Sequence, residues 1–93
     1  MKYVWDLDRE IANIRKHGYS FSSAIEAFSD KDGFALEDVK HSDVEHRFYW
    51  LGKDTTGTIL TVRYVRRGTS IRIFGCANWR EFRKVYYEKT KNK

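Results

Sequence analysis

Arginines recur on three strand-like segments and on the helix-like segment that follows them. The cationic side chains of this set are Arg47, Arg63, Arg72, Arg80, Arg83 and Lys84. A guanidinium group stays charged at any relevant pH and forms paired hydrogen bonds to phosphate oxygens. Arginines that converge on one sheet face would bind an RNA backbone and stabilise the extra negative charge of a pentacoordinate phosphorane. The alternative is a solvated sheet face on which arginines lie over aromatic rings.

Two kinds of side chain could move a proton beside such arginines. Tyr87 lies near the end of the last predicted helix, and Glu45 and Glu88 are the nearby acids. A phenol or a carboxylate among cations can have a shifted pKa and act in proton transfer. The alternatives are an amphipathic tyrosine at a helix edge and ordinary solvated acids.

The segment HSDVEH, residues 41–46, resembles a histidine–glutamate metal motif. Its spacing is H-x-x-x-E-H, which differs from the zinc spacings H-E-x-x-H and H-x-x-E-H, and it lies at a turn that enters a strand. We therefore expect no metal and no other cofactor. His41 and His46 are interpreted as turn and surface residues, with acid–base catalysis as the lesser alternative.

The positive charge lies in the second half of the chain. The net charge is +5, from 18 basic and 13 acidic residues. Residues 1–40 carry 6 basic and 8 acidic groups, a net of −2, whereas residues 41–93 carry 12 and 5, a net of +7. This asymmetry favours a polyanion or an acidic protein as the partner. Lys16, in the sequence KHG, could also reach a phosphate.

Composition predicts one cytoplasmic domain over residues 1–93. No apolar run approaches the roughly 20 residues of a membrane span, and the N-terminus has no apolar signal core. The single Cys76 cannot form an internal disulfide and is interpreted as a small core residue in a reducing compartment.

Periodicity and capping residues predict an α+β fold in the order β-α-α-β-β-β-β-α, with two N-terminal helices and one C-terminal helix on a single antiparallel sheet. Ile11 and Ile14 of the first helix are expected to face the core, and Gly18 to end that helix. Short turns should pair the later strands antiparallel. Phe82, Val85 and Tyr86 should dock the last helix on the sheet. The expected strands are 2–5, 34–40, 45–52, 58–66 and 70–76, and the expected helices are one ending near 17, one after 20 or 22, and 78–89.

Four segments together resemble the BrnT family of bacterial ribonuclease toxins. They are WDLDREIANIRKHGYSFSSAIEAFSD, HSDVEHRFYWLG, ILTVRYVRRG and IRIFG, which span nearly the whole chain. The resemblance implies a RelE-like fold and metal-independent RNA cleavage, in which a ribose 2′-hydroxyl attacks the adjacent phosphate. It also implies a hetero-oligomer with an antitoxin, BrnA, and binding to operator DNA only through that complex.

The resemblance also assigns site residues. Glu45, Arg47, Arg63 and Arg72 match family active-site candidates, and Tyr87 matches the tyrosine near the end of the last helix. On this basis Arg63, Arg72 and Arg80 would clamp the scissile phosphate, and Glu45 or Tyr87 would move a proton. The remaining cations are expected to bind RNA; they are Arg47, Lys16, Arg83 and Lys84.

One departure from the family leaves two further hypotheses. Many members follow the last strand with Ser-Ala-Arg, where this chain has Gly75, Cys76 and Ala77. Arg80 could replace the missing arginine, or the chain could be a non-catalytic module that binds an antitoxin and represses transcription. A weaker alternative is a stand-alone RNA-binding domain that stacks bases on Tyr49 or Trp50.

Overall fold

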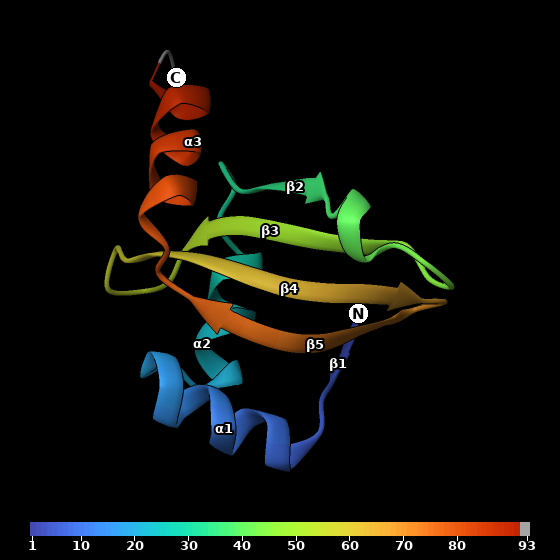
Figure 1. The fold of residues 1–93 in the computed structure, drawn as a ribbon. Helices are drawn as coiled ribbons and strands as arrows, with labels where there is room; N and C mark the ends of the chain where they lie inside the picture. The colour runs from blue at the N-terminus through green and yellow to red at the C-terminus, as the bar shows by residue number, and fades with distance from the viewer. Residues whose placement is uncertain (92–93) are drawn as a thin grey trace.

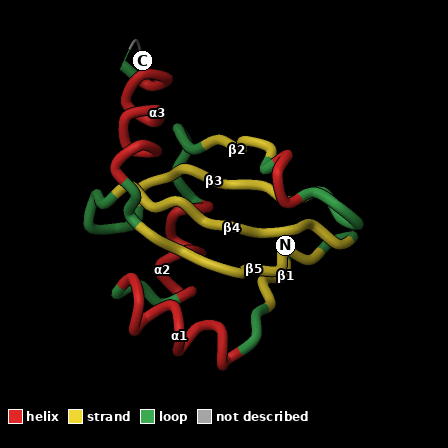
Figure 2. Tube along the Cα trace, viewed as in Figure 1, coloured by secondary structure: helices red, strands yellow, loops and turns green. Residues whose placement is uncertain are grey.

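The computed structural model describes residues 1–91 and confirms the predicted order of elements (Figures 1 and 2). A short 3-10 turn, η1, lies between the second and third strands. The strands are β1 (Lys2–Val4), β2 (Phe34–Glu37), β3 (Arg47–Lys53), β4 (Ile59–Arg67) and β5 (Ser70–Ala77); the helices are α1 (Leu7–His17), α2 (Phe21–Phe28), η1 (Val39–His41) and α3 (Arg80–Thr90).

The sheet has the strand order β1-β5-β4-β3-β2. Strands β2 to β5 pair antiparallel, as predicted, but β1 lies parallel to the first half of β5, with Lys2 opposite Ser70. The prediction of a wholly antiparallel sheet was therefore wrong at this edge. Hairpin turns fix the direction of the strands they join, and no hairpin joins β1 to β5.

One face of the sheet packs on α1 and α2, which lie together on that side in Figure 1. Leu60, Val62 and Ile73 are fully buried there against Phe21 and Ala24 of α2. Burial does not alternate along β4, however, because Thr61 and Val65 on the other face are buried as well. Cys76 belongs to the same core with 1% exposure, so its interpretation as a core residue is confirmed.

Polar side chains, rather than aliphatic ones, anchor α1. Asn13 is 7% exposed and exchanges hydrogen bonds with both the backbone N–H and the C=O of Cys76, at 3.0 and 2.8 Å. Glu10 accepts hydrogen bonds from Trp5 Nε1 and Phe21 N. The prediction that Ile11 and Ile14 face the core was wrong, because the helix turns Asn13 toward the edge of β5. The two isoleucines are 41% and 44% exposed.

The second face of the sheet is only partly covered. Helix α3 stands at the end of the sheet where β5 finishes (Figure 1), and it packs Phe82 and Tyr86 near Tyr49 and Leu51. The Tyr86 hydroxyl donates a 2.6 Å hydrogen bond to Asp30. Val85 is 37% exposed and is not among the residues of this cluster, so its predicted docking role was wrong.

Helix α3 begins at Arg80, two residues later than expected. Similarly, the predicted strand 34–40 ends at Glu37 and gives way to η1, and the strand predicted over 45–52 begins only at Arg47. Glu45 is therefore in the loop before β3. No helix within residues 1–91 is both long and apolar enough to cross a membrane.

Candidate nucleic-acid site

The uncovered part of the second sheet face carries Arg47, Arg63 and Arg72, and we call it the arginine face. Val65 of β4 pairs with Arg47 of the neighbouring strand β3 and with Arg72 of the neighbouring strand β5. Paired residues point to the same face of a sheet, so both arginines share a face with Val65. Arg63 lies two residues before Val65 on β4 and points to the same face. The prediction that these three strands bring their arginines to one face is confirmed.

A β-bulge shapes the centre of the arginine face. Arg63 pairs with Gly75 and Tyr64 with Ile73, so Phe74 has no partner on β4. A Cβ at Gly75 would lie 2.8 Å from Nε and 2.9 Å from Nη2 of Arg63. The guanidinium therefore lies across the bare backbone of Gly75. Its Nε–H is buried and has no hydrogen-bond acceptor among the described residues.

Phe74, the bulged residue, lies between cations from two elements. Arg9 of α1 lies 5.3 Å and Arg47 of β3 lies 4.8 Å from the centre of its ring. Cation–π contacts of this kind hold guanidinium groups in place without neutralising them. Phe74 thus lies between Arg9 of α1 and Arg47 of the arginine face, and both guanidinium groups remain available to an anion.

A pocket on one side of Phe74 is built from α1 and the sheet. Arg9, Lys16 and His17 line it together with Arg63. Burial lowers the pKa of His17, and the charges of Lys16 and Arg63 lower it further. The His17 ring also makes an edge contact with Trp79, 5.7 Å between centroids. Lys16 and Arg63 therefore line the same pocket, and the binding of RNA by Lys16 stays a prediction.

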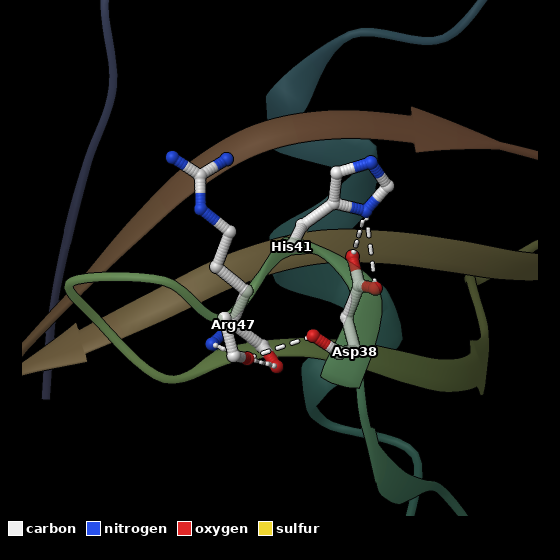
Figure 3. A network of polar contacts seen from close by, with 4 residues as sticks. Asp38, His41 and Arg47 are labelled. Carbon is white, nitrogen blue, oxygen red and sulfur yellow. Dashed lines mark hydrogen bonds and ion pairs between the residues drawn. The ribbon is translucent and has the colours of Figure 1, made fainter.

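The loop from residue 38 to residue 47 forms the other side. Asp38, with an 8% exposed side chain, accepts a hydrogen bond from His41 Nδ1 at 2.8 Å, while the His41 side chain is 51% exposed. The Ser42 hydroxyl donates to the Asp38 carbonyl and accepts from Arg47 N, which closes the loop. Figure 3 shows the His41 ring and the Arg47 side chain extending to the same side, with the second ring nitrogen directed away from Asp38.

Two pockets of different size share His41 and Arg47. One lies among Asp38, Arg63 and Phe74, and the other reaches Glu45. Burial raises the pKa of the neighbouring Tyr49, as does its proximity to the Asp38 carboxylate. The arginine face therefore has a carboxylate–imidazole pair at its edge.

Glu45 is held by an arginine that the sequence analysis did not select. Its carboxylate accepts hydrogen bonds from Arg67 Nε at 2.6 Å and Arg67 Nη2 at 2.7 Å. This fork lowers the pKa of Glu45 below its usual range, and the charges of Arg67, Arg47 and Arg72 act in the same direction. Glu45 is therefore an ionised acceptor close to Arg47 and Arg72.

The remaining candidates lie on α3. Arg80, Lys84 and Tyr87 are exposed on the helix, and the Tyr87 ring contacts Tyr86, at the end of the sheet near Phe34. Arg83 donates hydrogen bonds to the carbonyl and the side-chain oxygen of Asn78, both at 3.0 Å. The contacts of the described residues do not bring Tyr87 to Arg63, and its catalytic role stays a prediction.

Three neighbours of the arginine face were missed, although sequence signals for two of them exist. Arg67 follows Arg63 by four residues, so strand alternation places both on one face. Arg9 precedes Asn13 by four residues on α1 and shares its side of the helix. The pairing of Asp38 with His41 had no such signal, because it depends on the turn at η1.

Metal-ligand side chains do not gather in the described part of the chain. Within residues 1–91, no group of three or more histidine, cysteine, aspartate or glutamate side chains could hold a metal ion. His46 lies 3.2 Å from Glu37 in an exposed pair, separate from the pair of His41 with Asp38.

The fold matches a solved ribonuclease toxin. The crystal structure of the Brucella abortus ribonuclease toxin BrnT superimposes with a TM-score of 0.65 and 20% sequence identity, over 85% of this chain and 96% of that chain. At this identity the likeness defines the class of fold: three helices with a five-stranded mixed sheet. No curated protein sequence matched the chain.

The sequence itself defines the family. Residues 5–81 match the family described as the ribonuclease toxin BrnT of type II toxin–antitoxin systems. The chain belongs to this family, as its sequence motifs predicted. Membership in a type II system implies an antitoxin partner.

Proposed function

We propose that the protein is a toxin ribonuclease that cleaves RNA at the arginine face without a metal ion. The observation that carries this proposal is the convergence of Arg47, Arg63 and Arg72 beside Phe74. A ribose 2′-hydroxyl would attack the adjacent phosphorus, and the bond from phosphorus to the 5′-oxygen would break. The products are a 2′,3′-cyclic phosphate and a 5′-hydroxyl.

Arg63 and Arg72 bind the scissile phosphate in this proposal. Their guanidinium groups stabilise the charge that develops on the phosphorane oxygens. The buried Nε–H of Arg63 has no acceptor among the described residues, and an unpaired buried donor is unfavourable. A small outward movement of the side chain toward a phosphate oxygen would satisfy it. Arg47 and Lys16 extend the cationic surface on the two sides of Phe74.

Arg83 and Lys84 of α3 would contact RNA beyond the scissile phosphate, whereas Arg80 would join Arg63 and Arg72 in binding it. Arg80 and Lys84 are exposed. Arg83 uses only its Nη1 atom in the hydrogen bonds to Asn78. We propose that Arg80 acts in place of the arginine that many relatives carry at position 77. Ala77 is 1% exposed in β5, so an exposed cation must come from a later position. Glu45 and Tyr87 remain proposed proton-transfer groups.

The partner is proposed to be a BrnA-like antitoxin, which forms a hetero-oligomer with the toxin in the cytoplasm. Operator DNA would be bound only through that complex. Co-expression with the product of a neighbouring gene and co-purification would test the pair. An isolated toxin that binds operator DNA directly would contradict the proposed route.

A non-catalytic role is the second candidate, and one observation favours it: the site has no arginine at Ala77. Induction of the protein without antitoxin separates the two functions. Growth arrest that Arg72→Ala relieves supports the ribonuclease. Arg66→Ala is the matched control, because Arg66 pairs with Ile71 and points to the opposite face of β4. Arrest that is equal in all three proteins would overturn the role of Arg72.

A further inference from the structure

We propose that His41 is the general base of the RNA cleavage reaction and that Asp38 positions it. This inference rests on the proposed ribonuclease function and assigns a proton acceptor to the same site. His41 was expected mainly to be a turn residue, and Asp38 lies outside the four segments that resemble the family.

The contact with Asp38 fixes the imidazole in one orientation. A carboxylate can only accept, so the Nδ1 atom at 2.8 Å must carry the proton. The Nε2 atom of the neutral ring then has a free lone pair, and Figure 3 shows this nitrogen directed away from the carboxylate. Asp38 is itself fixed, because its backbone N–H donates to the Arg47 carbonyl at 2.8 Å and its carbonyl accepts from the Ser42 hydroxyl at 2.7 Å.

The location of His41 fits proton transfer at a bound phosphodiester. His41 shares one pocket with Arg47, Arg63 and Phe74, and its side chain is 51% exposed. A buried carboxylate behind an exposed imidazole is the arrangement by which an aspartate holds a histidine base in the productive tautomer. A phosphodiester bound by Arg47 and Arg63 would therefore lie beside residues that share this pocket with His41.

The reaction balances with these groups. His41 Nε2 takes the proton of the 2′-hydroxyl as the bond from that oxygen to phosphorus forms. The bond from phosphorus to the 5′-oxygen breaks, its electron pair leaves with the oxygen, and water protonates this oxygen. The imidazolium, stabilised by Asp38, then releases its proton to solvent. Arg47 and Arg63 remain charged throughout.

Glu45 is the competing base on the same loop. Its carboxylate is already held by two short hydrogen bonds from Arg67, and these hold its pKa below the usual range. A base with a lowered pKa takes up a proton less readily near neutral pH. Among the described residues, by contrast, no hydrogen-bond partner contacts Nε2 of His41.

Charged groups face His41 from several elements. They are Asp38, Lys40, Asp43 and Glu45 from its own segment, Arg47 from β3 and Arg63 from β4. Ordinary carboxylates titrate near pH 4 and lysine and arginine above about pH 10. A loss of activity as the pH falls through about 8 to 5 is therefore typical of an imidazole. His17 and His46 are the other two histidines of the chain, and each needs a control.

The test measures cleavage of a short RNA by the purified full-length protein as a function of pH. His41→Ala and His41→Gln should lower kcat by about 10² to 10⁴-fold, with little change in KM or Tm. Free imidazole should restore cleavage by His41→Ala in proportion to its neutral form. His46→Gln removes the imidazole that pairs with Glu37 outside the site, and this variant should be fully active. His17→Gln should retain the acid limb of the pH profile.

Asp38 is tested as a positioning residue. Asp38→Asn should lower kcat in the wild-type background and have no further effect on cleavage in His41→Gln. A purely structural role would give additive losses in the double variant. Full activity of both His41 variants, with Arg63→Ala inactive, would overturn the role of His41 and leave the ribonuclease in place. Absence of cleavage by the folded wild-type protein would overturn both proposals.

Discussion

The guanidinium of Arg63 lies across Gly75, so closely that a Cβ on Gly75 would be 2.8 Å from Arg63 Nε. The bulge at Phe74 causes this approach, because it places Phe74 and Gly75 opposite one residue of β4. Because Gly75 has no side chain, the Arg63 guanidinium lies over bare backbone. The position of the central arginine therefore depends on a glycine.

Gly75→Ala should lower cleavage while leaving the protein folded. The added methyl meets only the end of a flexible side chain, so we expect the free energy of unfolding to change by less than about 1 kcal/mol. The displaced guanidinium should lower kcat/KM by about 10-fold or more, since a shift of about 1 Å at a reacting centre can cost up to 10²-fold. Kinetics and chemical denaturation measure the two effects.

Gly52→Ala provides the contrast for that prediction. A Cβ there would lie 2.3 Å from the backbone oxygen of Ala27, which cannot move aside as a side chain can. This variant should lose stability as well as activity. An active Gly75→Ala protein would show that the placement of Arg63 on Gly75 does not matter for cleavage.

The ion pair of Glu45 with Arg67 should make stability depend on acid pH. Hydrogen bonds from Arg67 lower the pKa of Glu45 in the folded state. The stabilisation is therefore present above the pKa of the unfolded chain, about 4.3, and is lost as the pH falls through the lower folded value. The difference in Tm between wild type and Glu45→Gln should shrink in that range and with added salt. A difference that is the same at all pH values would contradict the pairing.

Asn13→Ala should be among the more destabilising single substitutions. The side chain satisfies both backbone groups of Cys76 and the carbonyl of Tyr19. Alanine would leave buried polar groups of β5 unpaired, which costs about 2 to 4 kcal/mol in total. Urea denaturation would measure the loss. Ala12→Ser, on the exposed neighbouring position, is the control and should change stability little.

Cys76 should be inert to thiol reagents in the native protein. Burial raises the pKa of its thiol to about 12, and the side chain is 1% exposed. The thiolate is the reactive species, so labelling at pH 8 should follow unfolding alone. Rapid labelling without denaturant, at a rate unaffected by stabilising conditions, would mean that β5 is open at this position.

The sheet and its arginines could be predicted because strands alternate. The alternation of side chains along a strand was enough to place Arg63 and Arg72 on the same face of the sheet. Hairpin turns set the directions of β3 to β5. The packing of α1 could not be predicted from apolar spacing, since Asn13 rather than Ile11 faces the sheet. The hydrogen bonds that orient α1 join Asn13 to Cys76, which are 63 positions apart in the sequence. The pair of Asp38 with His41 likewise depends on a turn that was expected to be strand.

The ribonuclease proposal is tested most directly by incubating the purified, antitoxin-free protein with end-labelled RNA in EDTA, beside Arg72→Ala and Arg66→Ala. We predict cleavage by wild type and Arg66→Ala, with 2′,3′-cyclic phosphate and 5′-hydroxyl ends, and none by Arg72→Ala. Intact RNA with folded wild-type protein, or equal cleavage by Arg72→Ala, would contradict it.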